Sequence, residues 1–187
     1  MIEIKDNFLG IKEFDMIQDT LMGNMFPWYY NPLIDFAEDK DKYQFTHIFF
    51  EHHRPTSNQS TELMAPLLIE IGPLLLWRIK ANLLTKTSNI IENEFHVDIV
   101  KIASLAMVKF GDVEIDSAED KRVLKQLTTS IFYVNTNNGY TKFKDGTKVE
   151  SVANRLVSFP SDMKHKGTSC TDEKIRIVIN FNYFKLF

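Results

Sequence analysis

The segment Lys174-Ile-Arg-Ile-Val-Ile-Asn-Phe-Asn-Tyr183 alternates large apolar side chains with a second, more polar set. Because successive side chains of a strand point to opposite faces, this alternation predicts a strand whose two faces differ in chemistry. One face holds only apolar side chains and indicates a hydrophobic core: Ile175, Ile177, Ile179 and Phe181. The other face carries polar groups that need partners wherever they are buried: Arg176, Asn180 and Asn182, with Val178 among them.

Similar patterns extend outward from this strand. Alternating segments predict antiparallel strands at residues 78–84, 95–99, 129–135, 140–143, 147–152 and 155–159, with Asn-Gly and Asp-Gly turn signals beside the fourth. Earlier in the chain we expect strands at 2–5 and 43–50, an aromatic loop at 26–32, and helices at 10–24 and 61–76. Helices first and consecutive antiparallel strands afterwards favour an α+β domain, with helices packed on a sandwich or barrel.

A helix near the N-terminus and a long connection in the middle of the chain add to this pattern. The helix predicted at 10–24 gathers apolar side chains on one face, namely Ile11, Phe14, Met16, Ile17 and Leu21. Residues 99–127 are long for a connection between strands, and 117–126 within them has the pattern of a capped helix. We interpret this acidic segment as an insertion, which is either solvated or a lid beside an active site.

Composition and charge exclude several classes of protein. The 187 residues, 44% hydrophobic and 25% charged, are typical of one globular domain. A net charge of −3 lacks the basic excess of a dedicated duplex-DNA-binding protein. Cys170 is the single cysteine, which excludes an internal disulfide framework and a cysteine-rich zinc site. No targeting segment is visible, and the most apolar stretch, 65–77, is too short to span a bilayer, so we expect a soluble protein.

The strongest chemical signal is His96-Val-Asp98. On a strand, residues two apart point to the same face, so the imidazole and the carboxylate can reach one metal ion. His165, after the strand at 155–159, is the best candidate for a third ligand. Two imidazoles and one carboxylate leave coordination positions open, as in non-haem Fe(II) oxygenases, whereas structural zinc sites are usually closed by four protein ligands.

Arg176 is the second signal. An arginine between isoleucines in mid-strand is expected to be partly buried, and burying it without a partner would cost several kcal/mol. Held in this way, a guanidinium is a bidentate receptor for a carboxylate. The alternative is an internal salt bridge to an acidic side chain. Arg176 follows His165 by 11 residues, so both can lie in one pocket, which favours a ligand.

Together, His96-x-Asp98, His165 and Arg176 resemble the motif of the 2-oxoglutarate- and Fe(II)-dependent oxygenases. Residues 131–135, 139–146 and 155–159 and the final strand resemble the prolyl-4-hydroxylase-like branch, in the same order. Residues 78–83 and 133–140 are similar to small stand-alone members found in tailed phages of marine bacteria. The connection from Asp98 to Tyr133 is longer than we expect in those members.

This resemblance implies a double-stranded β-helix, or jelly roll, with N-terminal helices packed on one side. A single domain at 1–187 would comprise a helical part at about 1–76 and a core at about 77–187, with the insertion at about 99–127. His96, Asp98 and His165 would hold Fe(II), which 2-oxoglutarate chelates. Arg176 and Tyr133 would bind the far carboxylate of 2-oxoglutarate, Asn180 would support the pocket, and Asn82 would approach the metal.

The implied activity is hydroxylation of a C–H bond with O2, coupled to decarboxylation of 2-oxoglutarate to succinate. The substrate stays open among a peptidyl proline, a free amino acid and a small metabolite. We expect no membrane or nucleic-acid partner, and a cytoplasmic location (that of the host if a phage encodes the protein). Alternatives are a non-catalytic binding protein on the same fold, and a cupin-like metalloenzyme without 2-oxoglutarate, which gives Arg176 no role.

Other features have simpler interpretations. We expect His52 and His53 to be solvated surface residues rather than a second metal site, and His47 to be an ordinary strand residue. Trp28-Tyr29-Tyr30 is either a substrate platform or part of the packing. Nothing around Cys170 suggests a nucleophile.

Overall fold

The computed structural model describes residues 1–34, 42–51, 53–56, 58–99, 122 and 125–185. Its helices are α1 (Ile11–Met22) and α2 (Asn58–Ile71). Its strands are β1 (Glu3–Lys5), β2 (Tyr29–Asn31), β3 (Gln44–Glu51), β4 (Arg54–Pro55), β5 (Leu75–Thr85), β6 (Leu127–Tyr133), β7 (Tyr140–Phe143), β8 (Lys148–Glu150), β9 (Arg155–Pro160), β10 (His165–Gly167) and β11 (Ile175–Phe184). Neither of these helices has the length and apolar character that a membrane-spanning helix needs.

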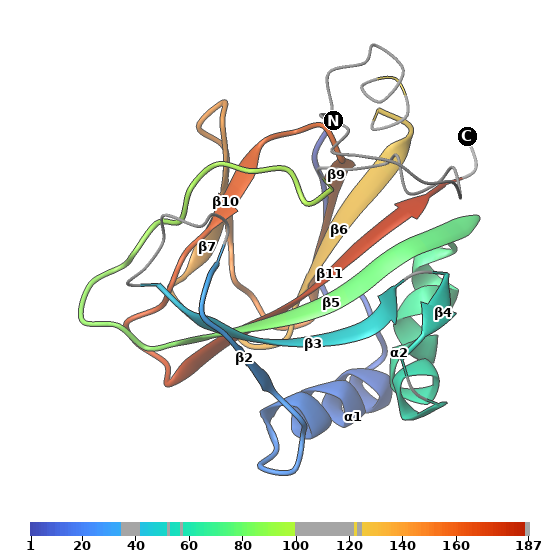
Figure 1. Cartoon of the computed structure of the whole chain (residues 1–187), viewed down its shortest axis with the longest axis horizontal. Coiled ribbons are helices and arrows are strands. Elements are labelled where there is room, and N and C mark those ends of the chain that lie inside the picture. Colours follow the sequence, from blue (N-terminus) through green and yellow to red (C-terminus); the bar gives the residue numbers. More distant parts are fainter. Residues whose placement is uncertain (35–41, 52, 57, 100–121, 123–124, 186–187) are drawn as a thin grey trace, which may run out of the picture.

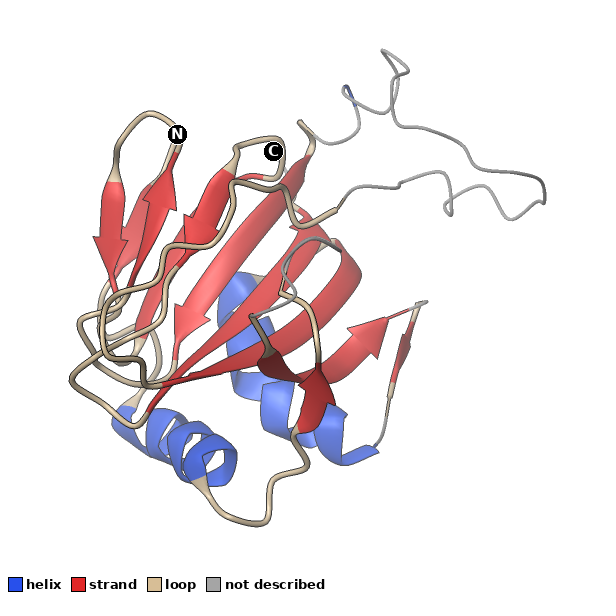
Figure 2. Cartoon of the chain, turned by 60° about the vertical axis from the view of Figure 1, so that its left-hand side comes forward, coloured by secondary structure: helices blue, strands red, loops and turns tan. Residues whose placement is uncertain are grey.

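The strands form two antiparallel sheets. The larger follows the order β1-β9-β6-β11-β5-β3-β2, with β4 paired to β3, and the smaller follows β10-β7-β8. Isolated bridges at Glu92–Thr168 and His96–His165 add the segment before Asp98 to the edge of the smaller sheet. Figure 1 shows the smaller sheet on one side of the larger and both helices on the other side. The α+β class and the jelly roll with helices on one side are therefore confirmed (Figure 2).

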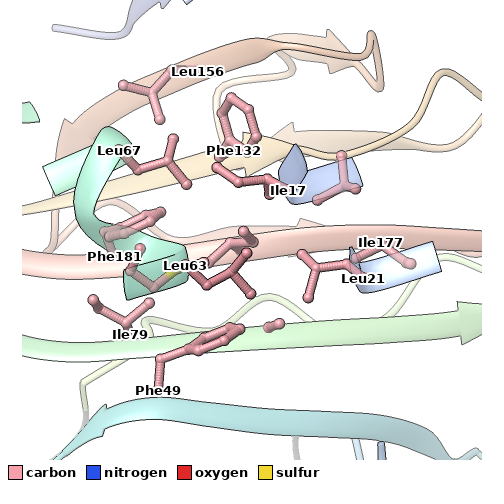
Figure 3. Packing of buried hydrophobic residues seen from close by; sticks show 14 of the residues in the cluster. Ile17, Leu21, Phe49, Leu63, Leu67, Ile79, Phe132, Leu156, Ile177 and Phe181 are labelled. Atoms are coloured by element: carbon pink, nitrogen blue, oxygen red, sulfur yellow. The ribbon is translucent and has the colours of Figure 1, made fainter. Parts of the chain in front are cut away.

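The main hydrophobic core lies between the two helices and the larger sheet (Figure 3). Helix α1 contributes Phe14, Ile17 and Leu21, which recur every three or four residues along one face. From β11, the predicted apolar face packs here, with Ile177, Ile179 and Phe181 fully buried. The opposite face of β11 packs partly against a second hydrophobic cluster and partly lines a cavity between the two sheets. The division of β11 into two chemically different faces is thus confirmed.

The helices differ from the expected ones in detail. In α1, Ile11 is 70% exposed and Met16 is 44% exposed, so neither lies on the buried face. Met16 is two residues from Phe14, or about 200° around a helix of 3.6 residues per turn, which turns it to solvent. Helix α2 begins and ends earlier than predicted. It ends at Ile71 because Gly72 adopts a left-handed φ of 60° and the chain then enters β5.

Some strands also differ. Residues 95–99 were expected to form a strand, but apart from the bridge at His96 they are irregular. Strands β2 and β10 were not expected, and both are only three residues long. The first 76 residues, expected to be the helical part, also supply β1 to β4. The insertion at 99–127 and the helix at 117–126 lie largely outside the described residues.

We predict that Leu21→Ala lowers the free energy of unfolding by about 2–5 kcal/mol, because Leu21 is fully buried between α1 and the sheet. Ile11→Ala in the same helix is the matched control, with an expected change within about 0.5 kcal/mol. Urea unfolding of both variants measures the difference. Equal losses would contradict the orientation of α1 described above.

Candidate functional site

A cavity of about 420 Å³ lies between the two sheets. The polar face of β11 forms one wall with Arg176, Val178 and Asn180. Next to it, β5 contributes alternate residues, which share a face because strand side chains repeat every two positions: Arg78, Lys80, Asn82 and Leu84. The opposite wall comes from the smaller sheet and the segment beside it, with Thr141, His165 and residues 95–98.

His96, Asp98 and His165 meet at one end of this cavity. Their ligand atoms lie within 4.8 Å of one another. Asp98 Oδ1 is 3.8 Å from His96 Nε2 and 3.7 Å from His165 Nε2. Each Nδ1–H donates to a backbone carbonyl two residues earlier, that of Glu94 or Met163, at 3.1 Å. Because a carbonyl oxygen can only accept, these bonds put a proton on each Nδ1, and in the neutral ring Nε2 is then the nitrogen that would bind a metal ion.

The backbone brings the two histidines together. His96 and His165 exchange backbone hydrogen bonds of 2.9 and 3.0 Å, so they form a directly opposed antiparallel pair. The edge of Phe159 packs on the His165 ring, with 4.8 Å between ring centroids. Asp98 joins them although its segment is irregular, because the asparagines of β11 hold its carboxylate. The predicted convergence of the three side chains is thus present, although the strand that was to produce it is not.

Asp98 remains ionised in this setting. Burial raises its pKa, but His165 and His96 when protonated, the Arg78 guanidinium and a hydrogen bond from Asn182 outweigh burial and hold the pKa at about 2. Arg78 and Asn182 act whatever the protonation of the imidazoles. The donors are therefore two imidazole nitrogens and a carboxylate oxygen, which suit Fe(II) and similar divalent ions. In the part of the chain that the structure describes, this group has no fourth acidic, histidine or cysteine member.

Glu92 anchors the segment that carries His96 and Asp98. Its carboxylate accepts hydrogen bonds from Tyr140 at 2.6 Å, Lys166 at 2.7 Å and Lys142 at 3.2 Å, all from the smaller sheet. The bonds from Lys166, Tyr140 and Lys142 hold the pKa of Glu92 at about 2, and the bond to Glu92 raises the pKa of Tyr140 to about 12. The anchor is therefore charged at neutral pH.

Arg176 is buried in the same cavity, with 3% of the residue exposed. Its Nε–H donates to Ser151 Oγ at 2.9 Å, and among the described residues no carboxylate lies within ion-pair distance of it. Burial lowers the pKa of Arg176, an effect that Tyr133 and Cys170 oppose. The internal salt bridge considered from the sequence is thus absent from the described part of the chain. A buried guanidinium without an anion is costly, so the site favours an anionic ligand.

Gly139 lets the chain pass close to this arginine. A Cβ atom there would lie 2.7 Å from Arg176 Cδ, 2.8 Å from Asn137 Oδ1 and 2.8 Å from the backbone oxygen of Ser169. No other residue fits without displacing the backbone. The turn that the sequence identified by its Asn-Gly pair thus packs directly on the candidate ligand-binding side chain.

Tyr133 stands one layer behind the cavity. Its ring is fully buried in the second hydrophobic cluster, and its hydroxyl donates to Thr141 Oγ1 at 2.7 Å. Burial raises the pKa of Tyr133, so the hydroxyl keeps its proton and remains a donor. Thr141, not Tyr133, is among the residues that line the cavity. Sequence reasoning missed Thr141, although its place two residues after Gly139 in a predicted strand was a usable signal.

Asn180 and Asn82 both line the cavity, as the alternation of their strands predicts. Asn180 Nδ2 lies 3.3 Å from Asp98 Oδ1, which places this residue at the metal end rather than beside Arg176. Arg78 and Asn182 also contact Asp98 and were not assigned a role from the sequence. The alternation in 78–84 had already put Arg78 on the face of Asn82.

The remaining candidates lie outside this cavity. His47 stacks between Phe26 and Phe49 and bonds to the Pro27 carbonyl through Nδ1, as an ordinary strand residue. His53 packs edge-on against Trp77, and His52 lies outside the described residues. Trp28 packs against the core, whereas Tyr29 and Tyr30 are more than 60% exposed. Burial raises the pKa of the Cys170 thiol, which does not suit a nucleophile.

We predict that Glu92→Gln destabilises the protein at neutral pH and less so in acid. The pKa of Glu92 falls from an ordinary 4.5 to about 2 on folding, so its contribution is complete above about pH 5 and is lost as the pH falls from 4.5 towards 2. Urea unfolding at about pH 7 and about pH 3.5 should therefore show a narrowing gap between wild type and variant. A gap that does not change with pH would contradict the ionised anchor.

Comparison with known proteins gives a fold but no sequence match. No protein-family model matches the chain, and no curated protein matches it. A prolyl hydroxylase from Trichoplax adhaerens, solved with a hypoxia inducible factor peptide, is similar with a TM-score of 0.62 and 12% identity, covering 98% of this chain and 83% of that one. A Pseudomonas putida prolyl-4-hydroxylase has a TM-score of 0.54 and 12% identity, with 98% and 92% covered. The non-heme alpha-ketoglutarate-dependent carbocyclase SnoK, from nogalamycin biosynthesis, has a TM-score of 0.62 and 10% identity, with 98% and 79% covered.

At these identities the likeness concerns the fold alone, and the named reactions include both hydroxylation and ring formation. Membership of the prolyl-4-hydroxylase-like branch and similarity to phage proteins therefore stay predictions. The chain has the jelly-roll fold of 2-oxoglutarate- and Fe(II)-dependent oxygenases, with a His-Asp-His cluster and a buried arginine in one cavity.

Proposed function

We propose that this protein is an Fe(II)- and 2-oxoglutarate-dependent oxygenase that hydroxylates a C–H bond. The observation that carries the proposal is the pairing of Arg176 with the His-Asp-His cluster. The cluster and a buried arginine without a carboxylate partner among the described residues line one cavity. An iron ligand set at one end and a receptor for an anion at the other together suit a chelating dicarboxylate.

The protein's own residues hold, orient and shield the reactants. His96, Asp98 and His165 would hold Fe(II), and Arg176 would pair with the far carboxylate of 2-oxoglutarate. Bound iron and 2-oxoglutarate would supply the oxidation, in which one oxygen atom of O2 would enter succinate, formed with CO2 from 2-oxoglutarate, and the other would enter the C–H bond. Apolar side chains in the cavity wall would limit the access of water: Leu84 opposite Arg176, Ile131 opposite Asn180, and Val178 between the two ends.

The spacing along β11 supports this assignment. Arg176 and Asn180 lie on the same face, four residues apart, which is roughly 13 Å of strand. Asn180 contacts Asp98, so the strand connects the two ends of the site. Thr141 lines the cavity near the end of β11 that carries Arg176. Its hydroxyl is oriented by the hydrogen bond from Tyr133. We therefore assign Thr141 to the cosubstrate carboxylate, with Tyr133 as its support.

Two alternative functions use the metal cluster and Arg176 differently. A cupin-like metalloenzyme would use the His-Asp-His cluster but leave the buried arginine without a role. A non-catalytic binding protein would use both features without turnover. The substrate itself is proposed only by class, as a peptidyl proline, a free amino acid or a small metabolite.

Turnover of 2-oxoglutarate in the absence of the second substrate distinguishes an oxygenase from these two alternatives. We expect the protein with Fe(II), ascorbate and O2 to release succinate slowly from 2-oxoglutarate, and Asp98→Ala to abolish the release. The variant Lys5→Ala, which removes an exposed ion pair with Glu3 outside the cavity lining, is the control for general damage. Absence of succinate from a folded, iron-loaded protein would contradict an oxygenase.

We predict that Arg176→Ala weakens 2-oxoglutarate binding on the order of 100-fold, because it removes the buried partner of a charged ligand. Metal affinity should change little, since Arg176 does not contact the cluster. Calorimetry with the Mn(II)-loaded protein under inert gas measures both constants. Unchanged affinity for 2-oxoglutarate would refute the role of Arg176.

Thr141→Val should weaken 2-oxoglutarate binding by roughly 10- to 100-fold, the cost of losing a hydrogen bond to a charged group. Tyr133→Phe leaves the Thr141 hydroxyl in the cavity wall, so we expect a loss of less than about tenfold. The same calorimetric titration compares the two variants. A larger loss in Tyr133→Phe than in Thr141→Val would instead favour direct contact by the tyrosine.

A further inference from the structure

The two oxygen atoms of the Asp98 carboxylate have different surroundings. Asn182 Nδ2–H donates to Oδ2 at 3.0 Å, a normal hydrogen-bond length. Oδ1 faces the two histidines, at 3.7 and 3.8 Å from their Nε2 atoms. The nearest Arg78 nitrogen is 3.8 Å from Oδ1, within ion-pair range but too long for a hydrogen bond. Asn180 Nδ2 reaches both oxygens, at 3.3 Å from Oδ1 and 3.5 Å from Oδ2. Oδ2 is thus held by the shorter bond from Asn182, and Oδ1 is the oxygen beside both histidine nitrogens that is presented to a metal ion.

Asn182 is fixed in the orientation that achieves this. Its second Nδ2 hydrogen goes to Thr129 Oγ1 at 3.1 Å, and its Oδ1 accepts from Arg78 Nε–H at 3.1 Å. Thr129 Oγ1 in turn lies 2.8 Å from Ser161 Oγ. The amide and both hydroxyl residues are fully buried. Turning the amide over would place its oxygen against the Asp98 carboxylate and its nitrogen against Arg78, which costs two buried hydrogen bonds.

We propose that Asn182, locked by Arg78, is a positioning residue that makes Asp98 a single-oxygen metal ligand. Arg78 acts by orienting Asn182, in addition to its charge. The carboxylate cannot rotate to offer both oxygens, so one further coordination position stays open for cosubstrate or O2. This inference rests on the metal site of the proposed function, but on neither 2-oxoglutarate nor turnover.

Polar neighbours that orient a metal ligand commonly affect metal affinity by 10- to 100-fold. The same effect is expected here, because without Asn182 the only amide partner of Asp98 among the described residues is Asn180, at 3.3 and 3.5 Å, and the carboxylate has more rotational freedom to lose. The arrangement also explains why β5 and β11 place Arg78 and Asn182 directly opposite each other in register.

The test is titration of the metal-free protein with Co(II), followed by the visible d–d absorption, which reports both affinity and coordination. Asn182→Ala should bind Co(II) about 10- to 100-fold more weakly, with a changed spectrum as the second oxygen of Asp98 becomes available. Arg78→Lys keeps the positive charge but cannot reproduce the Nε–H bond, so it should change in the same direction. Asn138→Ala removes an exposed asparagine that bonds to Thr171 and does not line the cavity, so it is the matched control.

Circular dichroism and thermal unfolding of each metal-free variant report whether it is folded. Arg78→Lys alters a residue whose side chain is 21% exposed, so it serves if Asn182→Ala does not fold. Wild-type affinity and spectrum in a folded Asn182→Ala, or in Arg78→Lys, would overturn the positioning role alone. Failure of the wild type to bind Co(II) would overturn both this inference and the metal site.

Discussion

Strand β11 is paired on both sides, and this pairing fixes the face of every side chain along it. It aligns with β5 from Ile175 to Phe184 and with β6 from Val178 onward. Beyond the end of β6, the Asn135 side chain continues the pairing by bonding to the backbone of Ile175 and Ile177. A shift of one residue would put Arg176 in the hydrophobic core, so the register is strongly specified.

The cavity follows from that register. The core side of β11 is closed by α1 and α2, and the other side faces a small sheet that is too narrow to cover it. Two opposite charges, the Asp98 carboxylate (side chain 4% exposed) and the buried Arg176 guanidinium, thereby line one cavity without contacting each other. The negative charge of Asp98 is offset by Arg78 and by the histidines when these are protonated. The positive charge of Arg176, in contrast, has only neutral partners among the described residues. This imbalance is what a bound anion would relieve.

Much of this arrangement follows from local sequence patterns. The alternation in 174–183 predicts both faces of β11, and the order of helices and strands predicts the fold class. The convergence of His96, Asp98 and His165 was predicted for a partly wrong reason, since their positions depend on one bridge and on long-range bonds to Asn182. No local sequence pattern indicates such long-range contacts. Thr141 differs, because its strand was predicted but its place in the cavity wall also depends on how the small sheet lies over β11.

The central claim is that one cavity holds a metal ion and 2-oxoglutarate together, and one measurement addresses it directly. The metal-free protein is titrated with Fe(II) and then 2-oxoglutarate under inert gas, with His96→Ala as the control. The account predicts a visible charge-transfer band from the chelated iron in the wild type and no band in the control. A folded wild-type protein that gives no band, or a control that gives the same band, would contradict it.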